Sequence, residues 1–350
     1  MGISDTLLGR KNVDGNPFIE AIEPSAALPG GEVRIVGKAL KPPHWARPEV
    51  TFSGLQASIV ASSDDFLIAR VPYGAHSGQV TIQSNGNLSN SREVKVAQPL
   101  AENLHPVANP AIDLEGNIYV TFSGGRGQKV PVSIFKIDTS YNVKPFVSDL
   151  MNATGMAFDS AGQLYVSSRY DGTVYKVAPN GSMTTYAEGM GVATGIAFDR
   201  EGSLYVGDRS GTIWRIAPDR QIFVFATLEP SVAAYHLAFS PSGTLYVTGP
   251  TTSSFDAVYA VDPHGTVTTF FRGLGRPQGI AFDAQGNLYV AASLAGKRGV
   301  VRITPDQKAS LAISGHGIVG LAFTRTGGAV LATTNAVFHL TWGIQPLSLI

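Results

Sequence analysis

Short hydrophobic runs alternate with Gly- and Asp-containing turns through most of the chain. The run ATGMAFDSAGQLYV at 153–166 is followed by ATGIAFDREGSLYV at 193–206, so the pattern repeats after about forty residues. In each copy a run with Gly and Ala leads into a tight turn and then into a hydrophobic -LYV- run. A later run alternates Val, Ile or Tyr with Lys or Arg, as in a strand with one wet face. This pattern predicts four antiparallel strands per repeat.

Six copies of this unit fit between residue 107 and the C-terminus. Radial repetition of four-stranded sheets at this period predicts a six-bladed β-propeller over residues 107–350, and the 3.6-residue spacing of a helical solenoid is not seen. We expect residues 336–342 and 344–350 to form the third and fourth strands of the last blade, with 94–104 able to add to it. The second strands are marked at intervals of 46, 40, 41, 43 and 41 residues by Tyr119, Tyr165, Tyr205, Tyr246, Tyr289 and, degenerately, Val330.

The N-terminal part has a different pattern. Seven short alternating runs separated by Gly, Pro and Asn turns predict a small immunoglobulin-like β-sandwich over residues 17–97. Residues 1–16 are polar and lack periodicity, which predicts a flexible tail, and residues 98–106 predict a short linker. The predicted fold class is all-β: a small Ig-like β-sandwich plus a six-bladed β-propeller of four-stranded blades.

Two parts of the chain resemble known families. The order P-x-I-x-x-I-x-P, P-G-G-x-V-x-I-x-G, V-x-F-x-G, V-P and G-x-V-x-I within residues 17–97 resembles the IPT/TIG family of immunoglobulin-like domains. That resemblance implies a spacer or interaction role. The pattern G-I-A-F-D-x-x-G-x-L-Y-V-x-D-x-x-x-x-I-x-R-I from Gly195 is similar to NHL-repeat and gluconolactonase-like six-bladed propellers. The shared residues are core and turn positions, so they indicate a fold rather than an activity.

Composition narrows the classes of function. Lys and Arg total 26 and Asp and Glu total 26, so we expect no nucleic-acid partner and no attraction to an anionic membrane. There is no Cys, which excludes thiol nucleophiles and thiolate metal sites. The start MGISDTLLGRKNVDGN lacks the apolar core of a signal peptide, and no run of about 18 apolar residues exists. We expect a soluble protein, cytoplasmic as written and extracellular or periplasmic if a leader was removed.

The resemblance to metal-dependent lactonases implies an axial site of Glu, Asn and Asp just before the inner strands of three blades. The corresponding residues here include no carboxylate and no Asn, and calcium needs several oxygen ligands, usually with a carboxylate among them. We therefore expect no metal and no cofactor, unless a rearranged lactonase site holds calcium or another divalent ion. The Asp residues of the DSAG, DREG and DAQG turns (159–162, 199–202 and 283–286) are interpreted as bonding to the turn backbone. The residues before the inner strands are Ala108, Thr154, Thr194, Tyr235, Gln278 and Val319.

Polar and aromatic residues mark the predicted loop face, where the outer-to-inner connections and the second-to-third-strand loops emerge. Tyr235 and His236 replace smaller residues there and either plug the channel or contact a ligand. With Gln278, they are the candidate catalytic residues if the protein is an enzyme. A local basic excess would attract an anionic ligand, and the alternative is solvated charges paired between neighbouring loops, such as Asp208 with Arg169 or Arg209. The candidate ligand-binding residues are Arg126, Arg169, Asp208, Arg209, Tyr235, His236, Arg276, Gln278, Lys297, Arg298 and His316.

Three functions remain open from the sequence. The leading hypothesis is a binding module that engages a small polar or anionic ligand, or a protein partner, on the loop face. The first alternative is a gluconolactonase-like hydrolase with a rearranged axial site. The second is a structural surface component in which the sandwich is a spacer. No phosphate loop, G-x-S-x-G elbow or H-E-x-x-H motif occurs to favour another chemistry.

Overall fold

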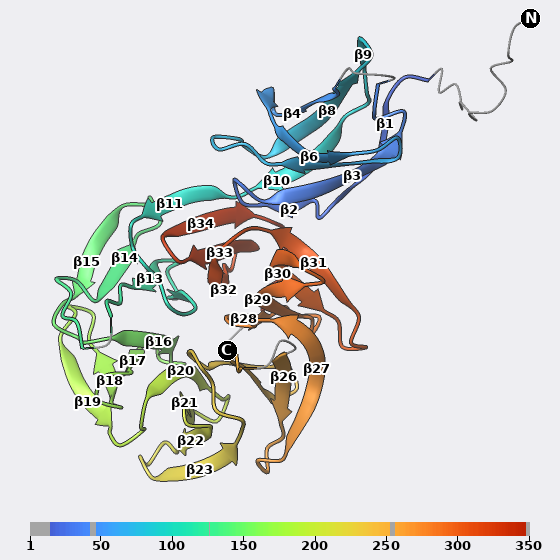
Figure 1. Cartoon of the computed structure of the whole chain (residues 1–350). Coiled ribbons are helices and arrows are strands. Elements are labelled where there is room, and N and C mark those ends of the chain that lie inside the picture. Colours follow the sequence, from blue (N-terminus) through green and yellow to red (C-terminus); the bar gives the residue numbers. More distant parts are fainter. Residues whose placement is uncertain (1–14, 43–46, 126, 253–255, 348–350) are drawn as a thin grey trace, which may run out of the picture. The chain divides into compact units, whose positions relative to one another are not determined.

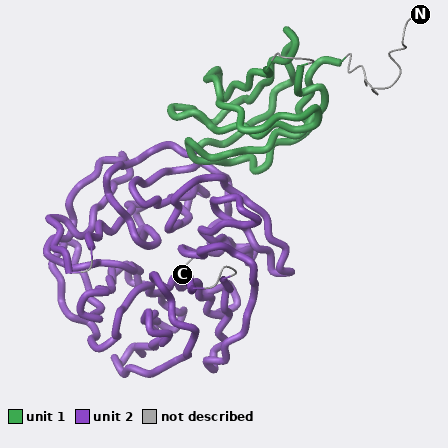
Figure 2. The backbone as a smooth tube through the Cα atoms, viewed as in Figure 1, with its two compact units in different colours: residues 1–96 green, residues 97–350 purple. Residues whose placement is uncertain are grey.

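The computed structural model describes residues 15–42, 47–125, 127–252 and 256–347. The chain divides into two compact units, Met1–Val96 and Ala97–Ile350 (Figure 2). This boundary lies beside the predicted end of the sandwich at residue 97. The predicted flexible tail at 1–16 falls almost entirely outside the described residues.

The first unit has two sheets around one hydrophobic core (Figure 1). In β3 (Glu32–Lys38), Val33 and Ile35 are fully buried whereas Arg34 is exposed, because alternate side chains of a strand point to opposite faces. The first sheet has the order β1 (Phe18–Glu23), β3, β7 (Phe66–Arg70) and β6 (Ser58–Ser62). The second has the order β2 (Ala26–Ala27), β10 (Arg92–Val96), β8 (Gly78–Ser84), β4 (Glu49–Phe52) and β5 (Leu55–Gln56), with β9 (Asn87–Leu88) beside β8.

The second unit is a β-propeller in which the described residues form six groups of four strands around a central axis (Figure 1). Blade 1 consists of β12 (Ala111–Ile112), β13 (Ile118–Thr121), β14 (Ile134–Ile137) and β15 (Val143–Val147). Blade 2 consists of β16 (Ala153–Phe158), β17 (Leu164–Ser168), β18 (Val174–Val177) and β19 (Met183–Ala187). Blade 3 consists of β20 (Ala193–Phe198), β21 (Leu204–Asp208), β22 (Thr212–Ile216) and β23 (Ile222–Thr227).

The remaining blades follow the same order. Blade 4 consists of β24 (His236–Phe239), β25 (Leu245–Thr248), β26 (Asp256–Val261) and β27 (Val267–Gly275). Blade 5 consists of β28 (Ile280–Phe282), β29 (Leu288–Leu294), β30 (Lys297–Ile303) and β31 (Ala309–Ser314). Blade 6 takes β32 (Ile318–Phe323), β33 (Gly328–Thr333) and β34 (Ala336–Thr341) from the C-terminal part of the chain.

The fourth strand of blade 6 comes from the start of the second unit. β11 (Gln98–Glu102) pairs antiparallel with β34 and closes the ring. The predicted linker at 98–106 is therefore wrong for residues 98–102, and the predicted outermost strand at 344–350 is wrong for its described residues, where Pro346 forms an isolated bridge with Asp283. The physical reason is that β34 would otherwise expose an unpaired edge, and β11, which lies within the segment 94–104 that was expected only as an addition, covers it.

Aromatic side chains pack between neighbouring blades in a repeated arrangement. In blades 1 to 4, the Tyr of the second strand contacts an aromatic residue of its own fourth strand and the Phe that ends the next inner strand. The Tyr205 ring lies 4.9 Å from Phe225 and 5.0 Å from Phe239, both edge to face. Such pairs contribute about 0.5–1.5 kcal/mol each beyond their buried area. The other sets are Tyr119 with Phe146 and Phe158, Tyr165 with Tyr186 and Phe198, and Tyr246 with Phe270 and Phe282.

Blade 5 differs in one member of this set. At the bulge of the fourth strand, where blades 1 to 4 have an aromatic residue, β31 has Ala312. The space beside Tyr289 is filled instead by Trp342, which follows β34 and lies 5.4 Å from the Tyr289 ring and 6.2 Å from Phe323. The aromatic residue that β31 lacks is thus replaced by Trp342, which follows the last strand of blade 6.

No helix long and apolar enough to cross a bilayer occurs in the described part of the chain.

Candidate functional site

The inner strands approach one another closely at the axis on the loop face. A Cβ on Gly195 would lie 2.3 Å from the carbonyl oxygen of Tyr235, and the Gly195 N–H donates to that oxygen at 2.9 Å. Glycine is required where backbones come this close. Four blades have glycine at this position of the inner strand, namely Gly155, Gly195, Gly279 and Gly320. Blade 1 has Asn109 there, and blade 4 has His236.

Asn109 joins three blades. Its side-chain Nδ2 donates to the carbonyl of Ile280 in blade 5 at 2.9 Å, and its Oδ1 accepts from the N–H of Leu321 in blade 6 at 3.1 Å. Both polar ends of the amide are therefore used to hold the ring together. Asn109 is a structural residue of the axis.

His236 is a neutral, buried imidazole. His236 is only 3% exposed. Burial lowers its pKa to about 4, because the charged form loses its hydration. No described residue hydrogen-bonds its ring. His236 therefore provides an uncharged donor and acceptor at the centre of the propeller.

Tyr235 lies in the core between blades 3 and 4 rather than on the loop surface. Its residue is 1% exposed and its hydroxyl donates to the carbonyl of Glu229. Burial raises the pKa of the phenol, so it stays protonated. The ring fits because the neighbouring positions are glycine: a Cβ on Gly249 would lie 2.6 Å from Tyr235 Cδ1, and one on Gly207 would lie 2.9 Å from Tyr235 Cβ.

Two predicted cationic residues bind backbone instead of neighbouring carboxylates. The Arg169 guanidinium donates to the carbonyl of Gly124 at 2.9 Å and thereby joins the loops of blades 1 and 2. The Arg209 guanidinium donates to the carbonyl of Val232 at 2.9 Å. Asp208 accepts from the N–H of Val192 at 2.8 Å and forms no ion pair among the described residues. The predicted pairing of Asp208 with Arg169 or Arg209 is therefore wrong, and Arg126 lies outside the described residues.

Strand pairing brings other predicted residues together at the loop end of blade 5. Gly275 of β27 pairs with Ser293 of β29, and Ser293 pairs with Arg298 of β30. The N–H of Gly315, beside the end of β31, donates to the Arg298 carbonyl at 3.1 Å. These pairings place three loops side by side.

Arg276, Lys297, Arg298 and His316 lie on or directly beside these three loops, and all four are exposed. Among the residues that the structure describes, Arg276, Lys297 and Arg298 take part in no ion pair. Gln278, two residues beyond Arg276, is half-buried beside them. We refer to these four residues (Arg276, Lys297, Arg298 and His316), which lie on adjacent loops, as the basic cluster.

Acidic residues near the basic cluster are directed elsewhere. Asp283 is the only acidic residue between residues 263 and 305, and it lies in the β28–β29 turn at the other end of the blade. Asp256, which pairs with Leu274 of β27, is 3% exposed and accepts hydrogen bonds from the N–H and hydroxyl of Thr251 at 2.9 and 2.7 Å. The cluster therefore presents positive charge to solvent without a carboxylate to neutralise it.

The axial residues do not fit the divalent ion of the lactonase resemblance. The residues before the inner strands are uncharged, and the Asn109 amide is already bonded at both ends. No group of three or more His, Asp or Glu residues in the described ranges is placed to hold a metal ion. No chemical step is therefore derived through a metal.

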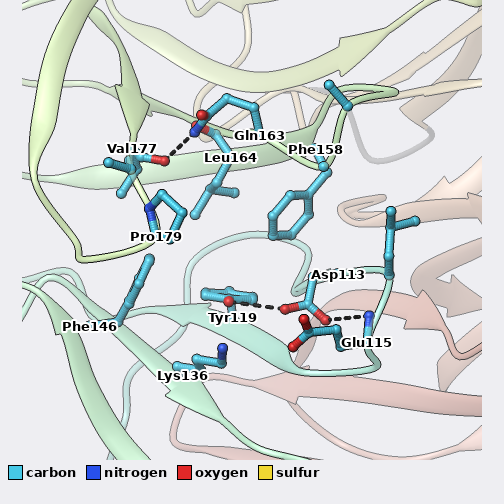
Figure 3. A pocket seen from close by; sticks show the side chains of 14 residues that line it. Asp113, Glu115, Tyr119, Lys136, Phe146, Phe158, Gln163, Leu164, Val177 and Pro179 are labelled. Atoms are coloured by element: carbon cyan, nitrogen blue, oxygen red, sulfur yellow. Dashed lines mark hydrogen bonds between the residues drawn. The ribbon is translucent and has the colours of Figure 1, made fainter.

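The opposite face carries the two tight turns of each blade. The interpretation of its Asp residues as turn-forming is confirmed: Asp159 Oδ1 accepts from the N–H of Gln163 at 2.9 Å, and Asp283 Oδ1 from that of Asn287 at 2.8 Å. Between blades 1 and 2 this face also has a pocket of about 270 Å³, which the sequence did not predict (Figure 3). The lining residues that Figure 3 labels include the charged side chains of Asp113, Glu115 and Lys136 and the rings of Tyr119 and Phe158.

Comparisons with known proteins agree with this architecture. A family model described as strictosidine synthase-like, N-terminal, matches residues 195–216, which span β20 to β22. No curated protein sequence matches the chain. A solved structure of a putative gluconolactonase gives a TM-score of 0.60 at 17% identity and covers 73% of this chain and 94% of its own.

Two other solved structures have similar scores. A gluconolactonase from Xanthomonas campestris gives a TM-score of 0.55 at 15% identity over 71% of this chain and 89% of its own. An auxiliary nutrient binding protein from Bacteroides thetaiotaomicron gives 0.55 at 12% identity over 94% of this chain and 98% of its own. At these identities the likeness concerns the fold. The family model and the solved structures together support a β-propeller fold like that of the gluconolactonases.

Proposed function

We propose that this protein is a binding module whose propeller holds a small anionic ligand at the basic cluster of blade 5. The single observation that carries the proposal is that strand pairing brings the three loops with Arg276, Lys297, Arg298 and His316 to one end of the blade 5 sheet, where all four residues are exposed. Guanidinium groups present several donors in a planar fork that matches carboxylate and phosphate oxygens. In a chain with no net charge, such a local excess attracts anions.

The fold relatives include gluconolactonases and an auxiliary nutrient binding protein, and the latter supports a binding role. The auxiliary nutrient binding protein matches 94% of this chain, so it shares both units. We propose that residues 17–97 form an IPT/TIG-like, immunoglobulin-like sandwich, since two sheets enclose one core there. In this proposal the sandwich is a spacer or an interaction domain, and the propeller carries the ligand site.

Thermal unfolding with small anions tests the proposal. Phosphate, citrate and gluconate are titrated separately against the wild type and an Arg276→Ala/Arg298→Ala variant. A ligand at a hundredfold its dissociation constant stabilises the folded state by about 2.7 kcal/mol, so we expect Tm to rise in the wild type and to stay constant in the double variant. Arg200→Ala, an exposed basic residue in the β20–β21 turn on the other face, is the matched control. Equal shifts in all three proteins would contradict the proposal.

Lactone hydrolysis is a second candidate, favoured by the neutral imidazole of His236, which no described residue hydrogen-bonds. A neutral imidazole accepts a proton as a general base, and Gln278 lies at the next blade. Hydrolysis of a small lactone that is lost in His236→Gln and in Gln278→Ala would support this function. Hydrolysis at the uncatalysed rate, with or without calcium, would exclude it.

A further inference from the structure

Blades 1 and 5 share a turn that the other blades lack. Residues 113–120 read DLEGNIYV and residues 283–290 read DAQGNLYV. In blade 1 the Asn117 side chain donates to Asp113 Oδ2 at 2.8 Å, and the Tyr119 hydroxyl donates to the same oxygen at 3.1 Å. In blade 5 the corresponding distances, from Asn287 and Tyr289 to Asp283 Oδ2, are 2.7 and 3.1 Å. The two turns therefore form the same local scaffold.

On blade 5, the chain's own C-terminal segment covers this turn. The N–H of Ala284 donates to the carbonyl of Gln345 at 2.9 Å, and the Gln285 side chain donates to the Gln345 side chain at 2.6 Å. Leu347 packs against the hydrophobic core of blade 5. Residues 343–347, GIQPL, are thus held by backbone, amide and apolar contacts, and Pro346 forms an isolated β-bridge with Asp283.

The segment is also held from the next blade. The N–H groups of Gly343 and Ile344 donate to the carbonyl of Gly327, in the β32–β33 turn, at 2.9 and 3.0 Å. The groove between the turns of blades 5 and 6 therefore binds a peptide through one N–H donor, Ala284, and one carbonyl acceptor, Gly327. The segment is thus recognised through main-chain hydrogen bonds to two turns.

The groove between blades 1 and 2 has the same donor and acceptor but no covering segment in the described residues. The positions equivalent to Ala284 and Gly327 are Leu114 and Gly162, and both line the pocket of about 270 Å³. Neither the Leu114 N–H nor the Gly162 carbonyl has a partner among the described residues. Leu114 is 56% exposed, so a large apolar side chain stands at the open rim.

Two differences between the grooves define what would fit. Glu115 takes the place of Gln285, so a cationic side chain suits the position of Gln345 better than an amide does. Phe146 already fills the space that Trp342 occupies at blade 5, since it lies 5.0 Å from Tyr119. An occupant therefore needs no aromatic residue. It needs an extended backbone, a Lys or Arg, and an apolar residue to cover Leu114.

We infer that the turn-face groove between blades 1 and 2 is a docking site for an extended peptide of a partner protein, with a basic residue facing Glu115 and an apolar residue beside it. The site is distinct from the basic cluster on the loop face. The chain's own segment 343–347, which occupies the equivalent groove of blade 5, shows how such a peptide would bind.

Fluorescence anisotropy with labelled peptides tests this inference on the full chain. The probe is GIKPL, which is the sequence of 343–347 with Lys at the position of Gln345, and the control peptide is GIEPL. We expect GIKPL to bind the wild type at least tenfold more tightly than GIEPL, and Glu115→Lys to reverse this order. Glu201→Lys, which changes the same turn position in blade 3, is the matched control and should leave both affinities within twofold.

Three results would overturn the inference. GIKPL could fail to show saturable binding up to millimolar concentration. Glu115→Lys and Glu201→Lys could weaken GIKPL binding equally, which would indicate general attraction to acidic turns. Finally, Gln285→Lys could abolish binding while Glu115→Lys does not, which would show that the peptide displaces the C-terminal segment from blade 5. Far-ultraviolet circular dichroism of each variant verifies that it is folded.

Discussion

Trp342 is expected to substitute for the aromatic residue that β31 lacks. Replacing it by Ala removes an edge-to-face contact with Tyr289 at 5.4 Å and a tilted contact with Phe323 at 6.2 Å, together worth about 1–2 kcal/mol. Trp342 is half-buried, so it covers roughly 100 Å², or about 2.5 kcal/mol at 25 cal/mol per Å². Trp342→Ala should therefore lower the free energy of unfolding by about 4 kcal/mol and Tm by about 10 °C.

The decisive variant is Ala312→Phe. In the Trp342→Ala background it places an aromatic ring at the bulge where blades 1 to 4 have one, and we expect it to recover about 2 kcal/mol. In the wild type the same substitution has no free space and should cost about 1–3 kcal/mol by overpacking. The double-mutant cycle should thus give a coupling energy of at least about 2 kcal/mol.

Thermal and urea unfolding, followed by circular dichroism, measure both effects. Trp342→Phe is the control, since it keeps one ring beside Tyr289 and should lose less than half of the stability. Additive effects of Ala312→Phe and Trp342→Ala would refute the reasoning, because they would show that the two side chains do not compete for one space.

Two further predictions concern the axis. Burial lowers the pKa of His236 from 6.5 to about 4. Between pH 6.5 and pH 4 the unfolded chain therefore binds a proton that the folded chain does not. The free energy of unfolding should fall by on the order of 3 kcal/mol as the pH drops from about 6.5 to 4. His236→Gln should flatten this part of the urea-unfolding profile, and an unchanged slope would contradict the prediction. Gly249→Ala should cost about 1–3 kcal/mol because its Cβ would meet the Tyr235 ring at 2.6 Å. This loss should disappear in Tyr235→Thr, and an equal loss in both backgrounds would refute it.

The sequence predicts most residues of the candidate site singly, but it does not predict which of them lie together. The sequence identified Arg276, Lys297, Arg298 and His316 individually as polar residues of loops. It did not group them, because the pairing of Gly275 with Ser293 and of Ser293 with Arg298 joins positions that are distant along the chain. Arg169 and Arg209 have the same sequence character, yet backbone carbonyls within reach bind them.

The sequence by itself determined the repeat. The alternation of hydrophobic runs with D-x-x-G turns specifies strand, turn and strand through local geometry, since side chains alternate along a strand and Asp bonds its own turn. The tightly packed axis also follows from it, because Gly in the inner strand is the residue that permits close approach of backbones.

Only the tertiary structure decided how the ring closes and which grooves are covered. β11 completes blade 6 from the other end of the unit, and residues 343–347 cover the turn of blade 5, whereas no segment among the described residues covers the same turn of blade 1. These choices depend on contacts between segments far apart in sequence. Their stabilities come from edge pairing and packing that no local pattern records.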